Sequence, residues 1–183
     1  YHRKLWEFTQ LVRALKENGL LSLDYLGLSV GAGFERVLYY LANQCGRIIA
    51  SDLYGDSAFA AGEASRSVLE DPARHAPYPY RQEALSAVYM NGCALGFPDS
   101  SFDFAFCLSS LEHFGGLENA AVCVREMARV VRPGGIVFFT TECSLNGFVT
   151  DEVFKPAEIE YLLTGSSLTL CEPFNWSLSG ETL

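Results

Sequence analysis

Apolar and polar positions along this chain follow two different repeats. Residues 3–17 carry apolar side chains at helical spacing, with charged side chains on the opposite side, which predicts an amphipathic helix. Comparable patterns predict further helices at 35–43, 57–70, 117–131 and 156–163. Short apolar runs predict six buried strands at 25–30, 47–51, 87–90, 102–108, 136–140 and 168–171.

This alternation of strands and helices predicts an α/β fold. The expected architecture is a doubly wound and mainly parallel sheet with helices on both faces. Because a crossover of helix length joins successive strands, we expect the first five to be parallel, in the order 3-2-1-4-5. Ligands of such sheets bind beyond the carboxyl ends of the strands. The residues that follow each strand are therefore the candidates for function.

Composition narrows the class of protein. Hydrophobic residues make up 49% of the 183 and the formal net charge is −9, which suits a globular core and argues against a nucleic-acid partner. No apolar run approaches the ~20 residues of a membrane span. The six cysteines, no two closer than fourteen residues, predict free thiols in a reducing cytoplasm and no metal site. The chain begins at Tyr1 without a signal segment, so we expect a trimmed or processed start.

The turn after the first predicted strand reads Gly31-Ala32-Gly33. Glycines let a backbone turn sharply and approach a ligand closely, although many strand-to-helix turns hold two glycines for structural reasons alone. A dinucleotide site would continue with a third small residue, whereas this chain has Glu35 and Arg36. A carboxylate in the first helical turn competes with a pyrophosphate for the positive helix end. The turn therefore favours a ligand without phosphates.

Asp52 ends the second predicted strand, twenty-one residues beyond Gly31. An acid at this place can accept hydrogen bonds from ribose hydroxyls. A lone acid is also typical of a solvated loop or a helix cap. The combination with the glycine turn favours the ribose interpretation, and an acid at an exposed strand end is expected to contribute little to folding.

Several motifs occur together in a fixed order. They are Gly31-Ala32-Gly33, Asp52, the run from Leu95 to Asp103, Leu111-Glu112-His113, and Arg132-Pro133-Gly134-Gly135. In this combination the chain, over roughly residues 22–172, resembles the class I S-adenosylmethionine-dependent methyltransferases, most closely the type 11 small-molecule branch. The resemblance implies a Rossmann-like sheet that binds the cofactor over its first three strand ends.

The resemblance also assigns roles to residues of the first two strand ends. Gly31 and Gly33 would pack under the methionine part of the cofactor. Asp52 would bind the ribose diol, and Leu53 would border the adenine. Glu35 stands where the family usually has a third glycine, and it is a candidate for the ammonium of the cofactor.

Further roles follow for the third and fourth strand ends. Asn91 replaces the usual acid beside the adenine amino group, and its side-chain oxygen can still accept a hydrogen bond. Gly92 would supply a backbone amide, and Leu108 would line the cofactor site. His113 is the candidate general base for a hydroxyl acceptor, with a histidine that only shapes the pocket wall as the alternative. Glu112 is expected to be structural or exposed.

The resulting hypothesis is a cytoplasmic methyltransferase with S-adenosyl-L-methionine as cofactor and no metal. Its acceptor would be a small or medium-sized molecule that is methylated at oxygen, with a glycan or secondary metabolite suggested by family analogy alone. Residues 1–20 would form a helix that caps the substrate side, and residues 21–183 a methyltransferase domain that is a candidate for C-terminal truncation. The alternatives are an inactive methyltransferase-like binding module and, less favoured, an NAD-dependent oxidoreductase.

Overall fold

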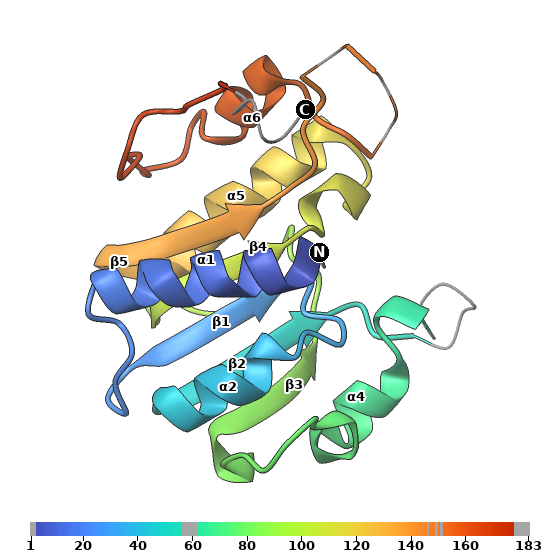
Figure 1. Ribbon diagram of the computed structural model, residues 1–183, viewed down its shortest axis with the longest axis vertical. Coiled ribbons are helices and arrows are strands. Elements are labelled where there is room, and N and C mark those ends of the chain that lie inside the picture. The colour runs from blue at the N-terminus through green and yellow to red at the C-terminus, as the bar shows by residue number, and fades with distance from the viewer. Residues whose placement is uncertain (1–2, 56–61, 146, 149, 151, 178–183) are drawn as a thin grey trace.

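Five parallel strands form the centre of the molecule. The computed structural model describes residues 3–55, 62–145, 147–148, 150 and 152–177. The strands are β1 (Leu26–Val30), β2 (Arg47–Asp52), β3 (Leu85–Tyr89), β4 (Phe102–Leu108) and β5 (Val131–Thr140). They pair in the order β3-β2-β1-β4-β5 (Figure 1), and every pairing is parallel. The predicted strand order is confirmed.

Helices cover both faces of this sheet, as the alternating pattern predicts. The helices are α1 (Arg3–Glu17), α2 (Val37–Gln44), α4 (Arg66–Glu70), α5 (Leu117–Val130) and α6 (Pro156–Leu162). Short 3₁₀ turns lie at Pro72–His75, Gln82–Ala84 and Leu111–His113. Of the predicted helix at 57–70, residues 57–61 lie outside the described part of the chain, and α4 accounts for its end.

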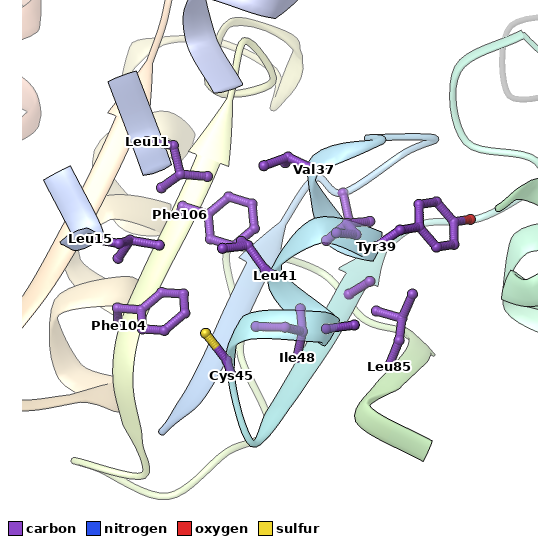
Figure 2. Close-up of a cluster of buried hydrophobic side chains, with 14 of the residues drawn as sticks. Leu11, Leu15, Val37, Tyr39, Leu41, Cys45, Ile48, Leu85, Phe104 and Phe106 are labelled. Carbon is purple, nitrogen blue, oxygen red and sulfur yellow. The ribbon is translucent and has the colours of Figure 1, made fainter. Parts of the chain in front are cut away.

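The core has two halves because successive residues of β4 point to opposite faces. Phe104 and Phe106 pack with Leu11 and Leu15 of α1 and with side chains of α2 on one face (Figure 2). Ala105 and Cys107 pack with α5 and α6 on the other face. Burial on both faces explains why β4 reads as a continuous apolar run.

Helix α1 packs on β4 and β5 and runs in the opposite direction to these strands. Its buried residues Leu11 and Leu15 contact the side of the sheet that carries Phe104 and Phe106. Figure 1 places the N-terminal end of α1 beside the carboxyl ends of the strands. This arrangement brings the first turn of α1 to the edge at which ligands of such folds bind.

Hydrogen bonds join two of the sequence motifs, the run from Leu95 to Asp103 and the motif that begins at Arg132. Asp103 accepts hydrogen bonds from the Leu26 amide, at 2.7 Å, and from Arg132, at 2.6 Å. β5 begins at Val131, directly after α5, so the Arg132 motif lies inside this strand. The register shifts between Phe102 and Phe104, so this stretch forms an irregular start of the strand.

The predicted strand at 168–171 is wrong. The backbone there has no regular secondary structure. Leu168 packs against the α5 and α6 half of the core, whereas Leu170 is 46% exposed. An alternating apolar pattern can reflect such one-sided packing, but a strand also needs a neighbour for its backbone hydrogen bonds.

Candidate functional site

A cavity of about 1330 Å³ opens at the carboxyl ends of the strands. Its lining includes every residue for which the sequence predicts a role in binding or catalysis: Gly31, Gly33, Glu35, Asp52, Leu53, Asn91, Gly92, Leu108 and His113. These residues come from four separate strand ends. The cavity volume is somewhat above the usual range of small-molecule sites, roughly 300–1,000 Å³.

The turn after β1 requires glycine for two reasons. Gly31 and Gly33 have φ angles of +64° and +45°, which disfavour other residues. A Cβ atom on Gly31 would lie 2.6 Å from the Cβ of Ser110, and one on Gly33 would lie 2.5 Å from the Glu63 carbonyl oxygen. The Ser110 hydroxyl also donates a hydrogen bond of 2.9 Å to the Gly31 carbonyl. The turn is therefore held closely against the end of β4.

The Asp52 carboxylate is part of the same turn. One oxygen accepts a hydrogen bond of 2.8 Å from the Gly33 amide, and the other accepts one of 2.7 Å from the Leu53 amide. Burial raises the pKa of Asp52, although both amide bonds act in the opposite direction. Each carboxylate oxygen retains a further acceptor position. Asp52 can therefore bind a diol in the cavity, and it also has a structural role that the sequence does not indicate.

Beyond β3, Asn91 is exposed and forms a turn. Its side-chain oxygen accepts a hydrogen bond of 2.9 Å from the Cys93 amide. The neighbouring Gly92 is buried, and a Cβ atom there would lie 2.7 Å from both Phe114 and Val30. Leu53 is 52% exposed and lines the same cavity. The exposed Leu53 side chain therefore offers an apolar surface to a ligand in this cavity.

His113 and Glu112 are adjacent in the sequence but have different surroundings. His113 lines the cavity, and its Nδ1 lies 3.6 Å from a carboxylate oxygen of Glu152. Glu112 is only 4% exposed and accepts a hydrogen bond of 2.9 Å from the Thr141 hydroxyl. Burial raises the pKa of Glu112. Of the two expectations for Glu112, structural or exposed, the structure agrees with the structural one, because the residue is buried.

The N-terminal helix supplies a wall of the cavity that the sequence does not single out residue by residue. Lys4 of α1 lies there, and its ammonium donates to Glu35 at 2.6 Å, to Glu7 at 3.1 Å and to the Leu108 carbonyl at 3.1 Å. The sequence does contain one signal for this buried contact. Glu7 precedes Leu11 by four residues and so lies on the apolar stripe of the helix, where a charged residue indicates a buried partner.

Burial and the charges of the partners shift the pKa values of Glu35 and Lys4 in opposing directions. Burial raises the pKa of Glu35, while the nearby Lys4 ammonium opposes the change. Burial by itself would lower the pKa of Lys4, but Glu35 and Glu7 together outweigh it and raise that pKa. Among the residues that the structure describes, no group of three or more His, Cys, Asp or Glu side chains is placed to hold a metal ion.

Comparison with known protein families identifies the domain. Residues 28–139, more than half of the chain, match the model of a methyltransferase domain. This chain belongs to the type 11 family of class I S-adenosylmethionine-dependent methyltransferases. The matched residues of this methyltransferase domain extend from β1 to β5, and they include all the predicted site residues. A comparison with functionally curated proteins found no match.

Solved structures show the same fold. A putative sarcosine dimethylglycine methyltransferase from Galdieria sulphuraria is 17% identical, with a TM-score of 0.63 over 86% of this chain and 59% of that chain. Geranyl diphosphate C-methyltransferase from Streptomyces coelicolor A3(2), solved with S-adenosyl-L-homocysteine, is 12% identical, with a TM-score of 0.63 over 85% and 57%.

A putative methyltransferase from Bacillus halodurans C-125 is 20% identical, with a TM-score of 0.60 over 83% of this chain and 66% of that chain. The methyltransferase domain covers only 52% to 59% of the length of the first three similar structures. Within the described residues, no helix has the length and apolar character needed to cross a membrane.

Proposed function

We propose that this domain is an S-adenosylmethionine-dependent methyltransferase that methylates an oxygen atom of a small or medium-sized acceptor. The observation that carries the proposal is the position of Asp52. Its carboxylate binds the glycine turn of β1 and lines the cavity in which every predicted cofactor residue lies. Family membership supports the same cofactor.

The residues after β2 and β3 suit the adenosine part of this cofactor. Asp52 retains one acceptor position on each oxygen for the two ribose hydroxyls. Leu53 offers an apolar contact for the adenine ring. The Asn91 oxygen accepts from the Cys93 amide and can accept a second hydrogen bond from the adenine amino group. Gly92 would contribute its backbone amide.

The residues after β1 and β4 suit the amino-acid part. Gly31 and Gly33 have no side chain that would fill the turn. Glu35 and the Leu108 carbonyl already accept hydrogen bonds from one ammonium group, that of Lys4. The same two acceptors fit the ammonium of the methionine tail. The residues of the cavity therefore match the cofactor at both ends.

The sulfonium of the bound cofactor supplies an activated methyl group. The protein then has to align an acceptor oxygen and accept its proton. We assign the proton to His113, which lies in the cavity wall. Glu152, 3.6 Å from Nδ1, would orient the ring so that Nε2 accepts the proton. The proposed acceptor is a hydroxyl of a glycan or secondary metabolite, and the net charge of −9 disfavours a nucleic acid.

Calorimetry with S-adenosylmethionine, S-adenosylhomocysteine and NAD tests the cofactor. We expect binding of the first two and none of NAD, and a preference for NAD would overturn the proposal. Methyl transfer from labelled S-adenosylmethionine to a panel of hydroxyl compounds tests the reaction. A domain that binds S-adenosylhomocysteine but transfers no methyl group to any acceptor would instead be a binding module.

A further inference from the structure

The ammonium group of Lys4 donates all of its hydrogen bonds to acceptors at the cavity wall. Its Nζ atom lies 2.6 Å from Glu35 Oε1, 3.1 Å from Glu7 Oε2 and 3.1 Å from the Leu108 carbonyl oxygen. An ammonium group has three N–H donors and no acceptor. Each donor of Lys4 therefore has one acceptor, and the acceptors come from α1, from the turn before α2 and from the end of β4.

Two of these three acceptors are the ones that the proposed function assigns to the methionine tail of the cofactor. They are Glu35 and the Leu108 carbonyl. A second ammonium cannot share them with Lys4 at hydrogen-bond distance, because two like charges a few ångströms apart repel strongly in a partly buried site. The lysine and the cofactor ammonium therefore compete for one place.

We propose that Lys4 is an internal occupant of the ammonium subsite, and that the ammonium of the cofactor displaces it. This inference rests on the proposed function. Loading of the cofactor then moves the Lys4 side chain, and with it the first turn of α1, away from Glu35. The N-terminal helix thus favours ligands that carry an ammonium able to replace its own.

The remaining contacts of α1 make such a displacement local. When Lys4 and the first turn move, Glu7 keeps the hydrogen bond of 3.0 Å from the Ser109 hydroxyl, which belongs to the segment after β4. Its buried carboxylate is therefore not left without a partner, which would be costly. Leu11 and Leu15 are fully buried further along the helix and hold it on the sheet. Only the first turn of α1 needs to move.

This exchange leaves Glu35 paired with an ammonium group. Glu35 is largely buried, and burial raises its pKa, so its charged form depends on a nearby cation. The ammonium of the cofactor replaces that cation one for one. Lys4 is 29% exposed along its side chain, so its ammonium can reach water without crossing the core.

The test uses two adenosine thioethers without a carboxylate, of which one has an aminopropyl tail and the other only a methyl group. S-adenosyl-3-thiopropylamine has an ammonium and no carboxylate, and methylthioadenosine has neither. We expect Lys4→Met to bind the amine ligand at least about tenfold more tightly than the parent and to bind methylthioadenosine equally well. Lys16→Met, which removes an exposed lysine at the other end of α1, is the matched control and should change neither affinity.

A second readout keeps the native Lys4. The chain has two tryptophans, Trp6 and Trp176, so Trp176→Phe leaves Trp6 of α1 as the only one. We expect the amine ligand, but not methylthioadenosine, to change the emission of Trp6 as the first turn moves. The change should disappear when Lys4→Met is added. Because the emission change is measured with the native Lys4, it tests the displacement even if Lys4→Met folds poorly.

The outcomes separate this inference from the proposed function. If the parent binds neither ligand, the proposed function fails and the inference fails with it. If methylthioadenosine binds but Lys4→Met binds the amine ligand no more tightly than the parent, the displacement is overturned and the cofactor assignment stands. An unchanged Trp6 emission on saturation with the amine ligand would overturn the movement of α1.

Discussion

At the scale of single residues, Asp52 combines a structural role with a binding role. The sequence places this acid at the end of a strand, where its loss should hardly affect folding. The structure adds two backbone amides, of Gly33 and Leu53, that depend on its carboxylate. A hydrogen bond to a charged group contributes about 1.5–3 kcal/mol. The carboxylate therefore stabilises the glycine turn before any ligand binds.

This double role makes the Asp52→Asn variant more informative than Asp52→Ala alone. We expect Asp52→Ala to weaken S-adenosylhomocysteine and methylthioadenosine by a similar factor, at least about tenfold, since 1.4 kcal/mol corresponds to that factor. It should also lower the melting temperature, because two amides lose their acceptor. Asp52→Asn keeps an acceptor for one amide and should unfold closer to the parent while still binding weakly.

Calorimetry measures the affinities and a thermal melt measures the stability. Unchanged affinity of both ligands for Asp52→Ala would remove the ribose assignment. Reduced stability of Asp52→Asn with full affinity would leave only the structural role.

Residue-scale prediction from sequence works where a role is tied to a strand end. The predicted binding residues all line one cavity because parallel strands bring their carboxyl ends to one edge. Lys4 was not predicted, because its partners Glu35 and Leu108 are distant in the sequence. A long side chain can reach any of several surfaces, and only the packing of α1 on β4 and β5 decides which one.

At the scale of elements, the bounds that follow from strong periodicity are accurate. The pattern at 3–17 predicts α1 at the same residues, and the run at 102–108 predicts β4. The start of β5 and the segment at 168–171 are wrong because their patterns depend on a neighbour. Arg132 lies in the irregular start of β5, where its side chain donates a hydrogen bond to Asp103. The 168–171 segment packs one side on the core without pairing its backbone.

The close packing of β1 against β4 requires a glycine at position 27, and this requirement can be tested. This glycine lies in the central strand, and a Cβ atom there would lie 2.3 Å from a ring carbon of the fully buried Phe104. We expect Gly27→Ala to lower the free energy of unfolding by about 1–3 kcal/mol through overpacking.

Urea unfolding measures this change. Gly96→Ala is the matched control, because the atom nearest to its new Cβ, in Met90, is 3.7 Å away. Equal stability of the two variants would contradict the close approach of β1 and β4.

At the scale of the whole molecule, the topology decides where a ligand can bind. The parallel order β3-β2-β1-β4-β5 gives the sheet one edge of carboxyl ends, and the large cavity lies there. A second cavity of about 1000 Å³ lies between β5 and the segments around α6. The sequence does not predict that cavity. Its walls include β5 and residues 168–171, and the sequence predicts the start of β5 and the structure of that segment incorrectly.

Hydrogen exchange can distinguish the two cavities in the intact domain. A ligand at the carboxyl edge should slow exchange of amides at 31–35, 52–53, 91–93 and 108–113, since these segments line the first cavity. Saturation with S-adenosylhomocysteine should therefore protect all four segments together. Methylthioadenosine should protect 52–53 and 91–93 to the same degree but 31–35 less, because it has no tail to contact the glycine turn. Protection confined to 136–143 and 159–170, around the second cavity, would place the ligand at the wrong edge for methyl transfer. It would contradict the site assignment even if S-adenosylhomocysteine bound tightly.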